Sequence, residues 1–246
     1  MAFPFETEDI QKAIELYYLG TIINEPLAGA ITFPFIDRNN KIRAIQVKAF
    51  DQNNKTSNTN WIHSITQKKY QYKKSNYPTW LSNYLKNEKK ATCLFGEHLL
   101  KKYPNNPVAL VEAPKTAIYG TLYYGFPDDE NKLLWLACFN LTSLNYERCK
   151  VLAGRKVVLF PDTSKNGNAY NKWSKKAQEF KTTINATFIV NALLEEKASK
   201  AEKEKGSDLA DYLIKYNWQD FRKPIINNGA PKIQKAILIA EVFETE

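Results

Sequence analysis

The sequence predicts an α/β protein in which a parallel-sheet domain is preceded by a smaller α+β region. From about Thr92 onward, short apolar runs alternate with segments of helical spacing, and this alternation is typical of a parallel sheet. Before that point, β-rich runs separated by a turn indicate a hairpin. We therefore expect three parts: a basic α+β subdomain over 1–104, a parallel-sheet domain over 105–216 and a C-terminal helical tail over 217–246.

The first part is predicted to open with a helix and a hairpin. Residues 6–19 form an amphipathic pattern with acidic residues in the first turn, and Gly20 follows as a stop signal. Residues 30–36 (AITFPFI) and 41–50 (KIRAIQVKAF) are predicted to pair as strands across a turn at 37–40. Three further segments follow: a polar loop over 51–60, a short strand over 61–65 and a basic, irregular or helical region over 66–90.

Four short apolar runs in the second part are predicted to be strands of one parallel sheet, buried on both faces. They are PVALVE at 107–112, LLWLACF at 133–139, KVVLF at 156–160 and ATFIV at 186–190. Helices are predicted around them, over 97–103, 114–123, 145–152, 168–182 and 208–216, with a charged helix or loop over 193–204 and a terminal helix over 233–243.

The composition favours a cytoplasmic protein that has no membrane partner. No apolar run approaches the roughly 18 residues that a membrane span needs, and the N-terminus MAFPFETEDI lacks the features of a signal peptide. Three cysteines, Cys93, Cys138 and Cys149, cannot all pair and form no C-x-x-C arrangement. Reduced thiols in a cytosolic chain are therefore expected.

The positive charge of the chain is concentrated in one segment. The net charge is +9, and residues 38–102 alone hold fourteen Lys and Arg against three Asp and Glu. Within this segment lysines and aromatic residues are interleaved: Lys68, Lys69, Lys73 and Lys74 with Tyr70, Tyr72, Tyr77 and Trp80. Lysines that neutralise phosphates beside rings that stack on bases suit single-stranded nucleic acid. The alternative is a solvated lysine face whose rings point into the core.

Two predicted strands end in an acidic residue. Glu112 ends the run PVALVE, and Asp162 follows the run KVVLF. Function in an open parallel sheet gathers at the carboxyl ends of the strands, where we expect the two carboxylates within about 8 Å of each other. A metal site or a catalytic acid is one interpretation, because an unpaired buried acid is costly. The alternative is that Asp162 caps the helix from residue 168 and Glu112 complements the helix over 114–123.

The ordered motifs VALVEAPKTAIYG, GRKVVLFPD and SDLADYL resemble the Toprim domain of bacterial and phage DNA primases, a fold shared with topoisomerases and some nucleases. Upstream, AITFPFIDRNNKIRAIQVKAF, WIHS and CLFGEHLLKKYP resemble the N-terminal half of a primase catalytic core. The order agrees over residues 30–215, and the layout is similar to that of Toprim-like proteins of Bacteroidetes mobile elements. The resemblance implies a Toprim-type parallel-sheet domain preceded by a smaller primase-like α+β subdomain.

The resemblance also implies a divalent-metal site. It assigns Mg²⁺ or Mn²⁺ to Glu112, Asp162, Asp208 and Asp211, and catalysis to Glu112 and Asp162. Lys115, at the start of the helix that follows Glu112, is a further catalytic candidate from its position alone. The second motif aspartate falls on Ser164 and a further motif acid falls on Thr116, so metal binding is expected to be weak. From the residues alone, Lys115 either reaches a phosphate or stays solvated. The residues expected to contact nucleic acid are Arg38, Arg43, Lys48, Lys68, Lys69, Lys73 and Lys74, with His63 as a weaker candidate that is equally consistent with a structural role.

The function implied by the resemblance is primer synthesis on single-stranded DNA, a metal-dependent nucleotidyl transfer in the replication of a mobile element or phage. A replicative helicase or another replication protein is the expected partner. Two alternatives stay open. One is a Toprim nuclease, in which the same metal activates water. The other is a nucleic-acid-binding replication module whose acids are degenerate.

Overall fold

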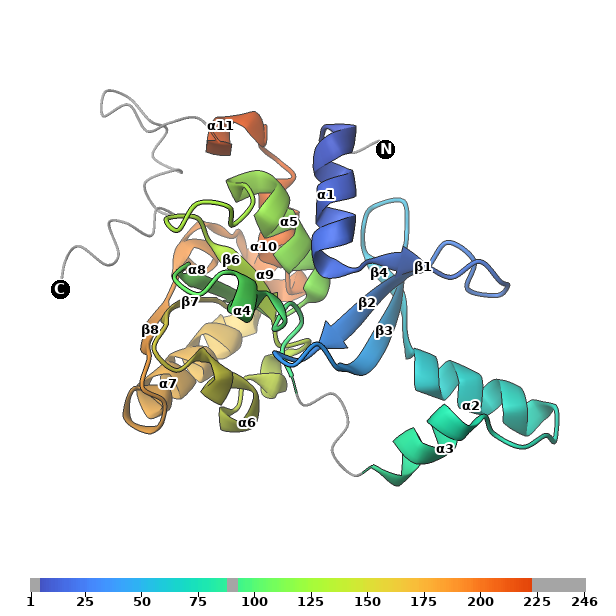
Figure 1. The fold of residues 1–246 in the computed structure, drawn as a ribbon. Helices are drawn as coiled ribbons and strands as arrows, with labels where there is room; N and C mark the ends of the chain where they lie inside the picture. Colours follow the sequence, from blue (N-terminus) through green and yellow to red (C-terminus); the bar gives the residue numbers. More distant parts are fainter. Residues whose placement is uncertain (1–4, 88–92, 223–246) are drawn as a thin grey trace. The chain divides into compact units, whose positions relative to one another are not determined.

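The structure, a computed structural model, describes residues 5–87 and 93–222 (Figure 1). These residues form two compact units, the first ending at His98 and the second beginning at Leu99. Each unit is described by itself below. The helix expected over 233–243 lies outside the described residues.

The first unit is built on a four-stranded antiparallel sheet in the order β1-β2-β3-β4. The predicted hairpin is confirmed as β2 and β3, and Asp37 shapes its turn because the carboxylate accepts the backbone N–H groups of Asn39 and Lys41 at 2.9 and 3.0 Å. The predicted first helix is confirmed as α1. The elements are α1 (Thr7–Tyr17), β1 (Gly20–Thr21), β2 (Ile31–Ile36), β3 (Ile42–Phe50) and β4 (Thr56–Trp61).

Two sequence predictions in this unit are wrong. The loop expected over 51–60 contains β4, which pairs antiparallel with β3 in the register Lys48↔Thr59. The reason is a second tight turn, in which the Asp51 carboxylate accepts the N–H groups of Asn53 and Lys55 at 2.9 and 2.8 Å. Cross-strand hydrogen bonds satisfy the backbone of this polar strand, and side-chain polarity does not reveal them.

The strand expected over 61–65 is likewise absent, because the chain turns from β4 straight into a helix. Trp61 closes β4 and is the N-cap of α2. The basic region over 66–90 takes the helical form of the two that the sequence allowed, as far as the described residues extend. Its helices are α2 (Ile62–Tyr72) and α3 (Thr79–Lys86).

Aromatic rings form the core of the first unit. Phe95 lies at its centre, with ring centroids 5.2 Å from Tyr17 and 5.9 Å from Phe35. All three side chains are fully buried. Because Tyr17 belongs to α1 and Phe35 to β2, this stacking fixes the helix on the sheet.

The second unit contains the predicted parallel sheet, in the order β6-β5-β7-β8. Every residue of β5 and β6 is completely buried, as expected for strands covered by helices on both faces. The chain runs from β5 outward to β6 and then crosses back to β7 on the other side of β5. The strands are β5 (Val108–Val111), β6 (Leu134–Ala137), β7 (Lys156–Phe160) and β8 (Thr187–Val190).

Helices surround this sheet close to the predicted positions. The helix expected over 97–103 is shorter and begins at Leu99. Glu97 lies before it, and its side chain accepts the N–H groups of Arg38 and Leu94. The α-helices are α4 (Leu99–Lys102), α5 (Pro114–Tyr124), α6 (Tyr146–Cys149), α7 (Asn168–Thr183), α8 (Leu193–Lys197), α9 (Lys200–Lys205), α10 (Leu209–Leu213) and α11 (Gln219–Arg222). Short 3₁₀ turns are η1 (Leu141–Ser143), η2 (Lys150–Leu152) and η3 (Lys165–Gly167). Among the described residues no helix is both long and apolar enough to span a bilayer.

The packing of α5 on the sheet depends on Gly120. A Cβ at this position would lie 2.3 Å from the ring of Trp135, which is completely buried on β6. We therefore expect Gly120→Ala to lower the free energy of unfolding by about 1–3 kcal/mol, although alanine ordinarily favours a helix over glycine by about 1 kcal/mol. Urea denaturation measures the change. The same substitution in a Trp135→Leu background serves as the control and should cost far less. A Gly120→Ala protein as stable as the wild type would contradict this packing.

Candidate functional site

The candidate site lies where the strand order of the parallel sheet reverses, between β5 and β7. The two strands are neighbours in the register Val111↔Phe160, so the residues that follow them emerge at the same edge. The Glu112 carboxylate accepts the backbone N–H of Asp162 at 3.3 Å. The Glu112 carboxylate therefore lies beside the Asp162 backbone, at the edge of the sheet that the two strands share. A crevice at such a reversal is the usual ligand position in open parallel sheets.

The downstream acids reach the same edge through α10. Asp208 is the N-cap of this helix, and Asp208 and Asp211 form a capping box in which each carboxylate accepts the backbone N–H of the other residue. The hydroxyl of Thr116 in α5 donates to Asp208 Oδ2 at 3.0 Å. Thr163, directly after Asp162, is joined to the backbone oxygen of Ser207 by its N–H and its hydroxyl at 2.9 and 2.8 Å.

Lys115 is buried among these acids. Its Nζ lies 3.1 Å from Asp208 Oδ2 and 3.6 Å from Asp211 Oδ1. The residue is 8% exposed. The interpretation in which Lys115 stays solvated is therefore wrong, and the reason is that a lysine in an acidic pocket gains two ion pairs that water would otherwise screen.

Burial makes the acidic pair costly to ionise. It raises the pKa of Glu112 to about 7, and the Asp208 charge adds to this effect. Burial, followed by the charges of Glu112 and Asp208, raises the pKa of Asp162 well above its ordinary value. Asp162 is partly exposed as a whole residue, yet its Oδ1 is buried and has no hydrogen-bond partner. An unpartnered carboxylate oxygen of this kind is a position that a cation would satisfy.

Helix capping does not explain Asp162. The N-cap of α7 is Gly167, and the first-turn N–H of Ala169 donates instead to Ser164 Oγ at 2.7 Å. Ser164 and Thr116, which stand where the resembling motifs have acids, thus both hold the site together through hydrogen bonds. The motif comparison marked these residues only as departures, and no local sequence signal predicted their partners.

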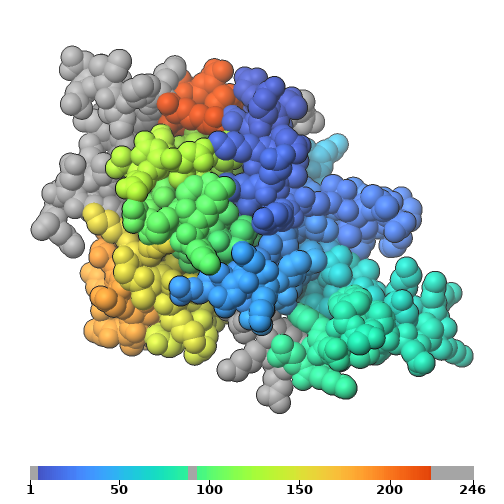
Figure 2. Space-filling model, viewed as in Figure 1, coloured from blue at the N-terminus to red at the C-terminus, as the bar shows by residue number. Residues whose placement is uncertain are grey.

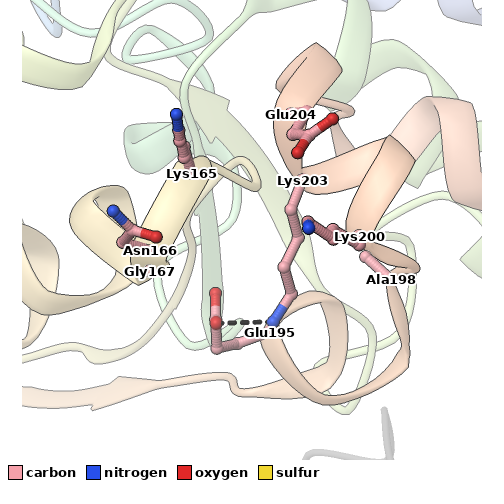
Figure 3. A pocket seen from close by; sticks show the side chains of 8 residues that line it. All are labelled: Lys165, Asn166, Gly167, Glu195, Ala198, Lys200, Lys203 and Glu204. Atoms are coloured by element: carbon pink, nitrogen blue, oxygen red, sulfur yellow. Dashed lines mark hydrogen bonds and ion pairs between the residues drawn. The ribbon is translucent and has the colours of Figure 1, made fainter.

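A pocket of about 330 Å³ lies beside the loop that follows β7 (Figure 3). One wall is η3, which contributes Lys165, Asn166 and Gly167. The other wall comes from α8 and α9, where Lys203 pairs with Glu195 at 2.7 Å. The sequence did not identify α8 and α9 as part of a site. The signal for the start of α9 is present, because Ser199 and Glu202 fit the S-x-x-E pattern and form a capping box there.

The candidate nucleic-acid contacts on the hairpin differ in accessibility. Arg38 is exposed in the turn, whereas the guanidinium of Arg43 binds Asp37, with Nε at 2.7 Å and a terminal nitrogen at 2.6 Å from Oδ2. Lys48 is 9% exposed on β3. Lys48 therefore adds little to an exposed basic surface.

The lysines of the α2 region are all exposed, and two aromatic residues are exposed with them. Tyr72 at the end of α2 is 92% exposed and Trp80 in α3 is 48% exposed, so these two rings do not point into the core. Lys68, Lys69, Lys73 and Lys74 surround Tyr72 in the sequence. The α2 and α3 surface is the teal region of Figure 2. Tyr70 and Tyr77 are partly buried.

His63 stands apart from that surface. Its ring lies 4.7 Å from the ring of Tyr84 and 6.1 Å from that of Trp61. These contacts join the start of α2 to α3 and to the end of β4, and they support the structural role for His63. Trp135 and Trp173 are completely buried.

The acids do not form a finished metal site by themselves. Within residues 5–87 and 93–222, no three His, Cys, Asp or Glu side chains are grouped as a metal-binding set. Glu112 and Asp162 form a pair, while the oxygens of Asp208 are taken by Thr116, Lys115 and the helix cap. A cation bound by all of them therefore requires Asp208 to exchange partners.

Part of the chain matches a protein-family model. Residues 1–163 match a family model described as a domain of unknown function, DUF6371. The matched range includes Glu112 and Asp162 and ends before Asp208. None of the curated proteins matches the chain.

Comparison with solved structures finds primase catalytic cores. The primase fragment of the bacteriophage T7 primase–helicase protein is 13% identical with a TM-score of 0.42, over 76% of this chain and 61% of that chain. The DnaG primase catalytic domain bound to ssDNA is 13% identical with a TM-score of 0.35, over 87% of this chain and 66% of that one. A DnaG catalytic core has the same identity and TM-score, with 64% of its length covered. The chain thus spans roughly three-fifths to two-thirds of these structures.

The raised pKa of Glu112 predicts a pH dependence of stability. Between its ordinary value of 4.5 and about 7, the folded chain binds a proton that the unfolded chain has lost, so the free energy of unfolding falls as the pH rises through this window. Glu112→Gln cannot ionise and keeps an oxygen for the Asp162 N–H. We expect this variant to be more stable than the wild type at pH 8, by on the order of 2 kcal/mol, and similar to it at pH 4.

Urea unfolding at both pH values in the presence of a chelator measures this difference. Glu196→Gln, which removes an exposed acid of α8, is the matched control and should change little at either pH. A wild type that is more stable than Glu112→Gln at pH 8 would show that the Glu112 carboxylate is well compensated in the folded chain.

Proposed function

The chain belongs to the DUF6371 family. We propose that its acidic cluster, formed by Glu112, Asp162, Asp208 and Asp211, is a Toprim-type metal centre that acts on nucleic acid. The observation that carries the proposal is the Glu112–Asp162 pair at the reversal point of the sheet, with a buried Asp162 oxygen that lacks a partner. The pKa values of these two adjacent acids are raised, so both are ionised most readily when a cation binds between them. The ordered motifs that resemble primases support the same assignment.

The donor set suits Mg²⁺ or Mn²⁺. Both ions prefer carboxylate oxygens, and Mg²⁺ commonly uses one or two protein carboxylates and keeps several waters. Glu112 and Asp162 would hold the ion, with Asp208 as a third ligand when it leaves Lys115. When bound, the ion neutralises phosphate charge and lowers the pKa of an attacking hydroxyl. The protein's part is to hold the two acids in register by the β5–β7 pairing.

The α2 and α3 surface is the proposed contact with nucleic acid. Residues 62–87 contain five lysines and no acidic residue, so they attract phosphates without internal compensation. The exposed rings of Tyr72 and Trp80 offer stacking surfaces, which unpaired bases can use and a closed duplex cannot. Single-stranded DNA is therefore the proposed partner.

The proposed reaction is primer synthesis. The 3′-hydroxyl of one nucleotide gives up its proton to water and its oxygen attacks the α-phosphate of a nucleoside triphosphate, which forms the new phosphodiester bond. The bond between the α-phosphorus and the oxygen that bridges to the β-phosphate breaks, and pyrophosphate leaves with the electron pair of that bond. The resemblance of the motifs supports a place in the replication of a mobile element or phage, with a replicative helicase or another replication protein as partner.

A non-catalytic nucleic-acid-binding module is the second candidate. It is favoured by Ser164, whose hydroxyl accepts the Ala169 N–H where the resembling motifs have an acid, and by the ion pair of Asp208 with Lys115. A primer-synthesis assay on single-stranded DNA with ribonucleotides and Mg²⁺ or Mn²⁺ separates the candidates. New primers that depend on Asp162 support the proposal, whereas cleavage of the template indicates a nuclease. If the chain binds DNA but yields neither primers nor cleaved template, it is a binding module.

The metal centre predicts measurable ion binding. Because the site has few free anionic ligands, we expect weak binding that is tighter for Mn²⁺ than for Mg²⁺. Asp162→Asn should weaken Mn²⁺ binding by roughly tenfold or more, and Ser164→Asp, which adds a carboxylate and still offers an oxygen to the Ala169 N–H, should tighten it. Calorimetric titration measures the affinities, with Glu196→Gln as the control. Absence of binding in the wild type and in Ser164→Asp would remove the catalytic proposal.

The basic surface predicts a steep salt dependence. Affinity for single-stranded DNA should fall as salt rises, with a slope of about −0.7 per phosphate contacted. Replacing Lys68, Lys69, Lys73 and Lys74 by alanine should flatten this slope and weaken binding at every sequence tested. Replacing four exposed lysines of the second unit, Lys172, Lys175, Lys181 and Lys205, removes the same charge and is the matched control. Fluorescence anisotropy at several salt concentrations makes the measurement. Equal losses in the two variants would place the binding surface elsewhere.

A further inference from the structure

Lys115 is a buried cation in an unusual place. It is the second residue of α5, in the first helical turn, and no acidic residue accompanies it there. The amino end of a helix carries a partial positive charge, which disfavours a lysine at this position. Lysines are also rarely buried unless they are paired. Helix formation therefore does not explain the burial of Lys115 at this position. The explanation lies in the side chains that it contacts.

The partners of Lys115 are the two acids of α10. Its Nζ lies 3.1 Å from Asp208 Oδ2 and 3.6 Å from Asp211 Oδ1, and the three side chains are between 9% and 12% exposed. The ammonium thus bridges two carboxylates away from bulk water, where the ion pairs are weakly screened. It holds the start of α5 to the start of α10.

The same ammonium acts on the other half of the cluster. Burial and the charges of Glu112 and Asp208 raise the pKa of Asp162, whereas the Lys115 charge lowers it. Lys115 is therefore within electrostatic reach of Asp162, yet Asp162 Oδ1 has no hydrogen-bond partner. One ammonium compensates the α10 acids and leaves the acids that follow β5 and β7 only partly compensated.

We infer that Lys115 is an internal cation that competes with a divalent ion for the acidic cluster. The inference rests on the proposed metal centre. Asp208 Oδ2 cannot serve a dication while it pairs with the ammonium, because two cations at one oxygen repel each other. An ion held by Glu112, Asp162 and Asp208 therefore displaces Lys115 from Asp208. The released ammonium is then available to a phosphate oxygen, so ion binding and phosphate binding are coupled.

This arrangement differs from a purely structural ion pair in one measurable way. A structural pair stabilises the fold whether or not a divalent ion is present. A competing cation stabilises the fold without the ion and weakens the binding of the ion. Removing the Lys115 charge should therefore lower stability in a chelator and raise affinity for the ion, two effects of opposite sign.

The test uses Lys115→Met, which keeps the length and apolar stem of the side chain and removes its charge. In the full chain, calorimetric titration should show Mn²⁺ binding roughly tenfold tighter than in the wild type, since the positive charge that pairs with Asp208 is removed. With a chelator, the variant should unfold at a lower temperature than the wild type. Added Mn²⁺ should raise its unfolding temperature by more than it raises that of the wild type.

Two further variants complete the test. Lys203→Met breaks the Lys203–Glu195 pair of the same unit and should leave Mn²⁺ affinity unchanged. Lys115→Arg keeps the charge and should not tighten the binding of Mn²⁺. If Lys115→Met fails to fold, Lys115→Gln is the charge-removing variant instead, and its Mn²⁺ affinity is compared with that of Lys115→Arg. Wild-type binding of Mn²⁺ that Lys115→Met and Lys115→Gln leave unchanged would overturn the inference and leave the metal centre standing. If neither the wild type nor any folded charge-removing variant binds Mn²⁺, the metal centre and this inference both fail.

Discussion

The parallel pairing of β5 with β7 is the constraint on which the second unit depends. It places the residue after Val111 opposite the residues after Phe160, and the Asp162 N–H then donates to the Glu112 carboxylate. A shift of one residue in this register would turn one of the two acids away from the other, because side chains alternate along a strand. Buried apolar side chains on both faces hold the register, so the core of the sheet and the geometry of the acidic pair have the same origin.

The acids of the acidic cluster are only partly compensated by hydrogen bonds and ion pairs. Thr116 and Lys115, both in the first turn of α5, bind Asp208 and so attach α10 to the helix that follows the first acid. The Ser164 hydroxyl in turn accepts the N–H of Ala169 in the first turn of α7. Thr116, which stands where the resembling motifs have an acid, is thus a hydrogen-bond partner of Asp208. Asp162 Oδ1 is left without such a partner, and this unpartnered oxygen is the basis of the affinity for a cation that we propose.

Charge is distributed unequally between the two units. In the first unit, α2 and α3 carry lysines beside the exposed rings of Tyr72 and Trp80, with no acid among residues 62–87 to neutralise them. Lysines and rings left in solvent contribute little to packing, so a role in binding phosphates and bases explains their position better than a role in the fold. The acids of the second unit lie at the edge of a rigid sheet, which suits chemistry that needs fixed geometry.

The sequence by itself determined the parallel sheet, since strands covered on both faces must be continuously apolar, and those short runs are visible without any partner. It also determined that Glu112 and Asp162 end two such strands. Only the tertiary structure decided that the polar stretch at Thr56–Trp61 is a strand, because its hydrogen bonds go to β3 and not to its own neighbours. Tertiary structure likewise decided that Lys115 is buried against Asp208, some 90 residues away along the chain. Local pattern encodes which face of an element is apolar, whereas the partner of a charged side chain is set by the packing of segments that are distant in sequence.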